Sequence, residues 1–482
     1  MKIPKAISKL QQFRQELYQL LPARRDALLD LLDALCSSPQ AQSVVELSLS
    51  PLFRREYGSL SDAIAHFFQA SCLEQAEAER REWEKDITRL IGRYVPEPQQ
   101  RRYWLLGTDV TPVPRPFART LADRGVVYQP NPVVGNKPIT LGHAYSALVY
   151  LPEKGQPDEP PWVIPLQMRR VQSQDKNNVV GADQLELLLE DQSLPFHTGL
   201  CVHVADSAYS AAEFLGRVGK HRNLVSVTRT AENRVFYHQA SPPSATSQGH
   251  PCWYGDRFDL KDATAWGPPD ETAETTLTTK RGRTYRVCLQ GWHNLLKRGQ
   301  RHLPMHRYPF TLIRAVVLDE HGQPVFKRAL WLVVLGERRG QLSLVESWQA
   351  YDQRYDLEHY FRFGKQRLLL TAYQTPDTEH EENWVALVGL ATVQLWLGRE
   401  LAGLHLRPWE RYLPHRTSGL ASPSQVQRDW ERIIQQIGTP APPPKRRGKA
   451  PGRAKGVKPG RRERLPVIKK SSRSRQTTLQ PV

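Results

Sequence analysis

The sequence predicts an α/β fold, chiefly because strand-like and helix-like segments alternate between residues 101 and 228. Apolar strand patterns are followed by turn residues, whereas the helical segments repeat their apolar residues every three or four positions. The expected strands are 103–109, 144–151, 162–168, 200–206 and 223–228, and the expected helices are 183–190 and 211–218. The order β-β-β-α-β-α-β predicts a mixed sheet with helices packed on it.

The composition changes along the chain and divides it into segments. Apolar residues at helical spacing dominate residues 1–98. Residues 237–340 are rich in Pro, Gly, Thr and aromatic residues, with strand-like runs at 284–290, 311–318 and 325–335. Helices are expected again at 383–398 and 424–437. We predict a helical N-terminal module at 1–98 that could bind DNA. An α/β core at 99–238 and 341–375 follows, with a β-rich insertion at 239–340 between its two parts. C-terminal helices at 376–440 and a basic tail at 441–482 complete the chain.

The net charge of +18 is concentrated at the C-terminal end of the sequence. Residues 441–482 contain 14 Lys and Arg against one Glu, which is +13 and leaves +5 for the other residues. This tail lacks apolar periodicity, so we expect it to be disordered. A polyanion is its natural partner, and nucleic acid is favoured over anionic lipid because no amphipathic helix accompanies the charge. A purely solubilising tail is the alternative.

Several features indicate a cytoplasmic, nucleoid-associated protein. The apolar run Trp384–Leu397 is too short for a bilayer and predicts a buried helix, and no apolar signal region follows Met1. The five cysteines (Cys36, Cys72, Cys201, Cys252, Cys288) are scattered, and their spacing favours reduced core thiols over a disulfide framework or a zinc site.

The most informative pattern is Tyr351, Arg354, Glu358 and Lys365. At 100° per residue these four positions fall within an arc of about 60° on one helix face. Ser343 and Glu346 have capping-box spacing, and we expect one uninterrupted helix from there to Gly364. A carboxylate framed by cations suits a site that holds a divalent ion and phosphate oxygens together. An ordinary solvated ion-pair helix is the alternative.

Two further carboxylates are expected at strand ends, Asp109 and Asp206. Together with Glu358 they provide oxygen ligands that suit Mg²⁺ or Mn²⁺, and two such ions can support an in-line phosphoryl transfer. Asp also commonly ends strands in turns, so each residue alone is weak evidence. Acidic residues at two strand ends and on a later helix are the layout of ribonuclease-H-like catalytic cores.

These residues resemble the DDE transposases, in particular the cut-and-paste insertion-sequence branch with the signature Tyr-x2-Arg-x3-Glu-x6-Lys, which Tyr351 to Lys365 fit without a gap. Asp109 resembles the first motif, and Asp206-Ser-Ala-Tyr209 followed by Val227-Thr-Arg229 resembles the second. The resemblance covers about residues 100–400. It implies that Asp109, Asp206 and Glu358 are catalytic ligands for two metal ions, and that Tyr351, Arg354, Lys365 and Arg229 contact DNA.

The resemblance also implies a role for Trp331, which would stack on a base flipped from the transposon end. A core tryptophan in an apolar strand is the alternative. Tyr355 stands where relatives often have Trp, which alters the expected stacking there. Lys137 and His143 lie in a block that also looks like one in related transposases; they could touch DNA, although a turn leading into a strand explains them equally well.

The resemblance therefore implies a metal-dependent DNA transposase that binds terminal inverted repeats, cleaves DNA and joins the 3′-OH ends to target DNA, as a homodimer on DNA. Water and then the 3′-OH would be the nucleophiles, so no covalent protein–DNA intermediate is required. Two rivals stay open, namely a ribonuclease-H-like nuclease without strand transfer and a DNA-binding protein without catalysis.

Overall fold

The computed structural model describes residues 2–72, 74–129, 133–156, 159–240, 252–279, 282–403, 420–445, 452, 454–458 and 460–469. Its α-helices are α1 (Lys2–Leu20), α2 (Arg25–Ser37), α3 (Gly58–Ala65), α4 (Ala76–Gly92), α5 (Asn177–Glu190), α6 (Ala212–Val218), α7 (Leu344–Gln353), α8 (Tyr355–Arg367), α9 (Thr378–Leu397) and α10 (Pro423–Ile437). Its strands are β1 (Trp104–Pro114), β2 (Gly125–Tyr128), β3 (Ile139–Tyr150), β4 (Ile164–Val171), β5 (Cys201–Ala205), β6 (Leu224–Thr230), β7 (Val235–Gln239), β8 (Tyr254–Asp259), β9 (Glu271–Thr278), β10 (Thr284–Leu295), β11 (Phe310–Leu318) and β12 (Leu330–Leu335).

A mixed ten-stranded sheet runs through the molecule in the order β2-β3-β1-β5-β6-β12-β11-β10-β9, with β4 paired to β3. β5 is parallel to both β1 and β6, and the other pairs of this sheet are antiparallel. The strands of the predicted β-rich insertion extend the core sheet, because β12 pairs with β6. The fold is mixed α/β, as predicted, and agrees with a ribonuclease-H-like core.

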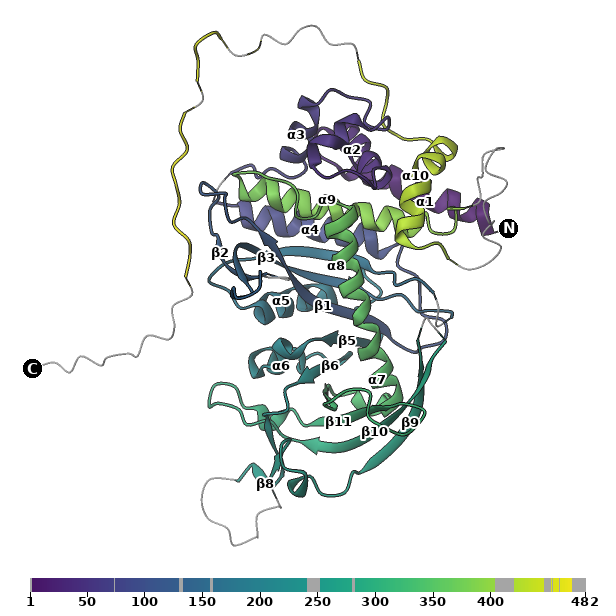
Figure 1. Ribbon diagram of the computed structural model, residues 1–482, viewed down its shortest axis with the longest axis vertical. Helices are drawn as coiled ribbons and strands as arrows, with labels where there is room; N and C mark the ends of the chain where they lie inside the picture. Colours follow the sequence, from purple (N-terminus) through teal and green to yellow (C-terminus); the bar gives the residue numbers. More distant parts are fainter. Residues whose placement is uncertain are drawn as a thin grey trace, which may run out of the picture.

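Helices cover both faces of this sheet. On one face, α7 and α8 pack against β1, β5 and β6, and Trp348 and Leu357 share a buried cluster with Val204, Val227 and Leu332. On the other face, α5 and α6 bury Leu185 and Phe214 in a second cluster. Figure 1 shows α8 and α7 as a nearly continuous column across the sheet.

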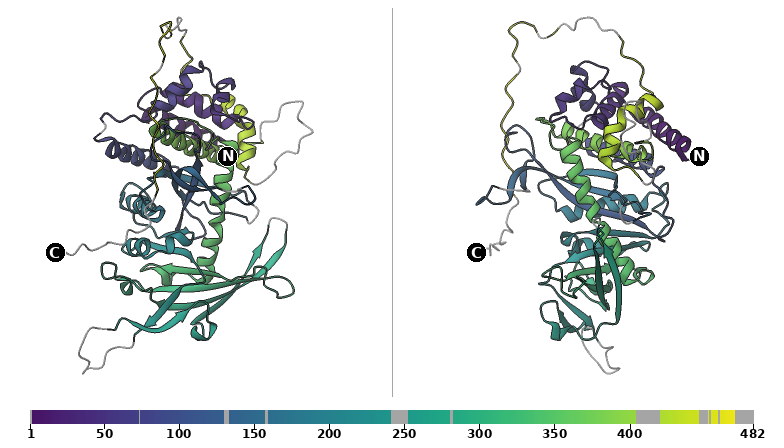
Figure 2. Two further views of the ribbon diagram at one scale, coloured as in Figure 1. Left: turned by 60° about the vertical axis from the view of Figure 1, so that its left-hand side comes forward. Right: turned by 45° about the vertical axis from the view of Figure 1, so that its right-hand side comes forward.

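The helices from the two ends of the chain form one body. α1, α2 and α3 pack against α9, and α2 also contacts α10, so residues from 1–98 and 376–440 share a single core. Inside it, the buried Arg14 guanidinium donates hydrogen bonds to Asp33 and, at 2.6 Å, to Gln394. Both views of Figure 2 show this helical body at one end of the molecule and the strands β9–β11 at the other.

Three expectations about individual elements are corrected. β1 does not end at Asp109 but continues to Pro114, because β3 pairs with it as far as Gly142. The helix expected from Ser343 onward begins with the predicted capping box but is interrupted at Arg354, where the Leu357 amide bonds to the Arg354 carbonyl, one residue closer than in an α-helix. α8 then continues past Gly364.

The chain termini and cysteines also differ in part from expectation. Residues 460–469 of the tail lie as an extended segment against the core rather than apart from it. Cys36 and Cys201 are buried thiols as predicted, whereas Cys72 and Cys252 are exposed. The apolar run Trp384–Leu397 is a buried part of α9. Among the described residues, no helix is long and apolar enough to cross a membrane.

Candidate active site

Asp109 and Asp206 lie at the same level on neighbouring strands. The parallel pairing of β1 with β5 runs as far as Gly107 opposite Val204, and each aspartate follows its strand's last paired residue by two positions. Asp206 also caps the short turn Ser207–Ser210, since its Oδ1 accepts a hydrogen bond from the Ala208 amide at 2.9 Å. Asp109 is therefore held within the paired part of β1, and Asp206 is held by the turn that follows β5.

The alternation of side chains sends both aspartates toward the face covered by α7 and α8. Asp109 shares the parity of Leu105, and Asp206 that of Val202 and Val204, and all three apolar residues belong to the cluster under these helices. Val202 and Val204 therefore share one face of β5, and Asp206 directly follows the end of that strand.

The Arg354 guanidinium connects Asp109 to Glu358. Its Nη1 lies 3.2 Å from Asp109 Oδ2, and its Nη2 lies 3.2 Å from Glu358 Oε1. Arg354 occupies the turn between α7 and α8, so Glu358 follows it by one helical turn. A carboxylate from the middle of β1 and one from the start of α8 thus share one cation.

Gly107 allows α8 to approach β1 this closely. A Cβ atom at Gly107 would lie 2.8 Å from Leu357 Cδ1, nearer than unstrained contacts allow. Leu357 precedes Glu358 and Gly107 precedes Asp109 by two residues, so a close approach of α8 to β1 lies beside the two carboxylates.

The protonation of Asp109 is shifted by its surroundings. Burial raises the pKa of Asp109 to about 6, although the Arg354 charge opposes this; Asp206 and Glu358 raise it further by repulsion. Carboxylates that perturb one another in this way lie close together, and such shifts are concentrated at functional sites.

Three other predicted DNA-contacting residues surround this cluster. Burial raises the pKa of the Tyr351 phenol, while the charges of Arg354 and Arg229 oppose that rise, so both cations lie near it. The Arg354 guanidinium stands 5.6 Å from the centre of the Tyr351 ring. Burial lowers the pKa of Lys365, and the Asp109 charge acts in the opposite direction.

A cavity of about 510 Å³ opens beside the two aspartates. Asp109, Asp206 and Tyr209 form one side of it, and β2 with the end of β4 forms another. Ile468 and Lys469 of the C-terminal segment also line it. Sequence reasoning missed Lys469, because residues 441–482 were expected to be one disordered tail; the apolar run Leu465-Pro-Val-Ile468 directly before Lys469 is the signal that separates it from the other cations.

The sequence model of one family, described as DDE superfamily endonuclease, matches residues 16–291, which is more than half of the chain. The chain belongs to the DDE superfamily of endonucleases. A search of curated proteins found no match. Membership supports a nuclease or transposase-like function with DNA as the substrate, and members of this superfamily generally use divalent metal ions. The matched range contains Asp109 and Asp206, and Glu358 lies beyond it.

The carboxylates of this endonuclease are of the type that binds a divalent metal ion, but they are not grouped closely enough to hold one. Asp109, Asp206 and Glu358 offer the hard oxygen donors that Mg²⁺ and Mn²⁺ prefer. Within the described ranges, however, no three His, Cys, Asp or Glu residues are grouped closely enough to hold a metal ion. Arg354 lies between Asp109 and Glu358 instead, so its guanidinium supplies the positive charge there.

Trp331 does not lie where base stacking requires it. Its side chain is 3% exposed, and its ring packs 5.1 Å from that of Trp266 and 5.9 Å from that of Trp292. β12 is an interior strand of the sheet. Leu332, the residue after Trp331 in this strand, faces α7, whereas Trp331 does not. Trp331 is therefore a core residue on the opposite face of the sheet from Tyr351.

Lys137 and His143, which could both touch DNA according to the sequence, lie in different environments. Lys137 is exposed before β3, whereas His143 is buried within β3. The two ring nitrogens of His143 lie 2.7 Å from Glu381 Oε1 and 2.8 Å from the Ala122 carbonyl oxygen. His143 thus joins β3 to α9 and is not available to DNA.

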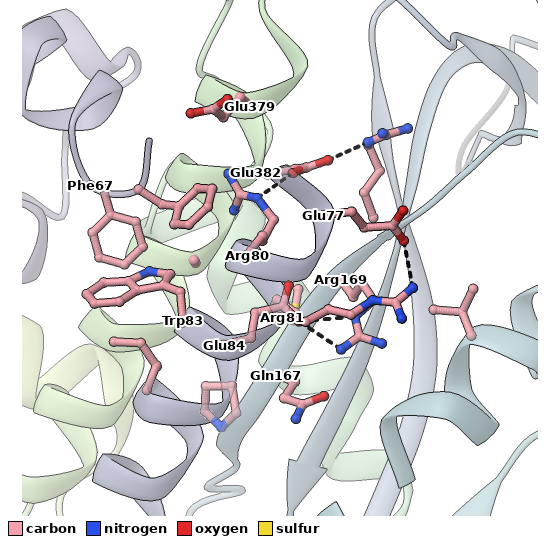
Figure 3. A pocket seen from close by; sticks show the side chains of 18 of the residues that line it. Phe67, Glu77, Arg80, Arg81, Trp83, Glu84, Gln167, Arg169, Glu379 and Glu382 are labelled. Carbon is pink, nitrogen blue, oxygen red and sulfur yellow. Dashed lines mark hydrogen bonds and ion pairs between the residues drawn. The ribbon is translucent and has the colours of Figure 1, made fainter. Parts of the chain in front are cut away.

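A second cavity, of about 340 Å³, lies between α4, β4 and α9. Figure 3 shows charged side chains around it that pair with one another, with Arg80 bound to Glu382 at 3.1 Å and Arg169 to Glu84 at 2.8 Å. Phe67 and Trp83 form its apolar side. Since these cations already bind carboxylates, this cavity is a weaker candidate for a phosphate site than the one beside Asp109.

Proposed function

We propose that this endonuclease is a DNA transposase that binds the terminal inverted repeats of its element, cleaves DNA and joins the resulting 3′-OH ends to target DNA. The observation that supports this most directly is the sharing of Arg354 by Asp109 and Glu358, with Asp206 beside Asp109 in one cavity. A carboxylate group built from three separate elements suits metal-dependent phosphoryl transfer.

In this proposal Asp109, Asp206 and Glu358 hold one or two Mg²⁺ or Mn²⁺ ions. Bound there, the metal would supply activation of the attacking oxygen and stabilisation of the leaving oxygen. Asp109 must be ionised to act as a ligand, and its pKa of about 6 allows this at neutral pH.

Arg354 would change partners when the site is loaded. Once positive charge is supplied to Asp109 and Glu358, the guanidinium loses its attraction to them and can turn to a phosphate oxygen, with which it forms paired hydrogen bonds. Lys365 and Arg229 would bind further phosphate oxygens on the same side. Tyr351 would orient a phosphate through its hydroxyl rather than attack it, since burial raises its pKa and keeps the phenol protonated.

Two alternatives predict different products. A ribonuclease-H-like nuclease would cut DNA without joining it, and a DNA-binding protein would bind without cutting.

We propose a homodimer on DNA because a transposase must hold two ends at once.

The proposal is tested with end-labelled DNA carrying the element's flanking ends, Mg²⁺ and a supercoiled target plasmid. Wild type is compared with Glu358→Gln, which keeps shape but removes a ligand charge, and with Glu337→Gln, an exposed glutamate in the loop before α7. We expect cuts at the repeat boundary that leave 3′-OH ends, joined products in the plasmid, and loss of both only in Glu358→Gln.

Other outcomes separate the alternatives. Cleavage without joined plasmid products identifies a nuclease without strand transfer. Tight binding of DNA with no cleavage by wild type identifies a DNA-binding protein without catalysis. Equal cleavage by wild type and Glu358→Gln contradicts the assigned site while leaving a nuclease in place.

A further inference from the structure

The C-terminal segment of residues 462–469, named here the docked segment, is attached to the core at several points. The Leu465 amide donates to the Arg119 carbonyl at 2.9 Å, and the Ile468 amide donates to the Arg124 carbonyl at 2.8 Å. Arg462 forms an ion pair of 3.0 Å with Asp377, at the start of α9. In Figure 1 the yellow C-terminal segment lies on the side of the molecule where β2 lies.

The sequence of the docked segment explains why it binds the core while its neighbours are exposed. Leu465-Pro-Val-Ile468 is an apolar run within a tail made mostly of basic, Pro and Gly residues. Leu465, Val467 and Ile468 are half-buried, whereas the described residues 460–464 are exposed. Burial of these apolar side chains favours docking, and the two backbone hydrogen bonds fix its register.

The docked segment ends at the carboxylate cavity. Ile468 and Lys469 line the same cavity as Asp109 and Asp206. Two of the contacts that anchor the segment, from Leu465 to Arg119 and from Arg462 to Asp377, lie before this point, and the Ile468 hydrogen bond to Arg124 holds the segment at the cavity itself. With the segment in place the cavity still measures about 510 Å³, which is within the range of ligand-binding pockets.

We propose that the docked segment is a clamp for the DNA strand that enters this cavity, and that Lys469 binds a phosphate of that strand beside Asp109 and Asp206. This inference rests on the proposed function, because it takes DNA as the occupant of the cavity. A cation on the rim offsets the repulsion between the phosphate and the carboxylates. The segment is anchored outside the carboxylates and leaves the cavity open, which favours a clamp over a plug.

The test compares full-length wild type with Lys469→Ala, Lys469→Arg and a matched control, Lys458→Ala. Lys458 is an exposed residue of the same tail, so the control removes the same charge without touching the cavity. Single-turnover cleavage of the element-end DNA with Mg²⁺ is measured, together with DNA affinity at several salt concentrations. We expect about a tenfold loss of cleavage rate in Lys469→Ala, recovery in Lys469→Arg and no change in Lys458→Ala.

Docking is measured separately by amide hydrogen exchange, which does not depend on catalysis. The Leu465 and Ile468 amides should exchange at least about tenfold more slowly than those of residues 454–458, and Leu465→Asp should abolish this protection. Unprotected amides overturn the proposal even if the enzyme cuts DNA. Protected amides in a protein that cuts no DNA leave the docking intact and count against the proposed function.

Two kinetic results would also overturn the clamp. Faster cleavage by Lys469→Ala or Leu465→Asp than by wild type would show that the segment blocks the cavity. An equal loss in Lys469→Ala and Lys458→Ala would show that only the total charge of the tail matters.

Discussion

Arg354 and Asp109 are 245 residues apart in the sequence, yet their side chains form an ion pair of 3.2 Å in the candidate active site. This pair opposes the effect of burial on the protonation of Asp109 and so determines the pH at which the site can bind a cation. Because metal and proton compete for the carboxylate, affinity for Mn²⁺ in wild type should rise as the pH increases through about 6 and then level off.

Arg354→Ala should move this midpoint to higher pH. Burial raises the pKa of Asp109, and the charges of Asp206 and Glu358 raise it further, so loss of the guanidinium removes a charge that opposes all three. Mn²⁺ titrations at a series of pH values measure the midpoint, with Arg362→Ala, which changes an exposed arginine of α8, as the control. An unchanged or lower midpoint in Arg354→Ala would contradict the assigned role of the pair.

Glu381 should be among the most important residues for stability. Arg115 Nε lies 2.7 Å from its Oε2 with both side chains fully buried, and the Tyr145 hydroxyl donates to its Oε1 at 2.9 Å. Removal of one partner leaves buried charge without compensation, so Glu381→Ala should lower the free energy of unfolding by about 3–5 kcal/mol.

Urea denaturation measures this change, and Glu337→Ala, at an exposed site, should shift the free energy of unfolding by less than about 0.5 kcal/mol. Burial acts to raise the pKa of Glu381, but hydrogen bonds from His143 and the Arg115 charge outweigh it and lower the pKa. The stability from this group is therefore present above pH 4.5, the ordinary pKa of Glu, and is lost as the pH falls below that value. A loss in Glu381→Ala no larger than in the control would refute its structural role.

Lys365 and Arg229 should each contribute one phosphate contact. Each alanine variant should weaken binding of all DNA sequences alike and reduce the slope of log affinity against log salt by about 1. Fluorescence anisotropy at several salt concentrations measures the slope. Lys261→Ala, in the exposed turn after β8, is the control, and Figure 1 shows β8 at the end of the molecule away from α8. An unchanged slope in the Lys365 and Arg229 variants would place the DNA elsewhere.

Trp331 should matter for folding and not for base recognition. Its indole is enclosed by Trp266 and Trp292, so Trp331→Ala should cost about 3–5 kcal/mol of stability. Trp331→Phe should retain folding and cleave DNA within about twofold of wild type. If Trp331→Phe folds normally but no longer extrudes a base, measured by 2-aminopurine fluorescence in the DNA, the residue acts on DNA after a rearrangement of this core.

Local sequence patterns predicted the elements that carry the two aspartates. β5 is an apolar run because it is an interior strand buried on both faces, and such a run is visible in the sequence. Asp206 directly follows this run. The Ser343 capping box is equally local. β9 was missed because most of its residues are polar and exposed, so the apolar pattern of a strand is absent.

Other features depend on contacts that a local pattern does not contain. β1 continues beyond Asp109 because β3 pairs with it, and the face on which Trp331 lies depends on the register of β12 against β6. The interruption at Arg354 involves no Pro or Gly; it places the guanidinium between two carboxylates. The docking of residues 462–469 requires the loop at 119–124, more than 300 residues earlier in the chain.

The central claim is that Asp109, Asp206 and Glu358 form one metal site. The most direct test is Mn²⁺ binding at pH 7.5 followed by electron paramagnetic resonance, comparing wild type with Asp109→Asn, Asp206→Asn, Glu358→Gln and the Glu337→Gln control. We predict that each of the three site variants weakens Mn²⁺ binding at least about tenfold, with no change in the control. Full retention of Mn²⁺ affinity in Glu358→Gln would contradict the claim, because the third carboxylate would then not belong to the site.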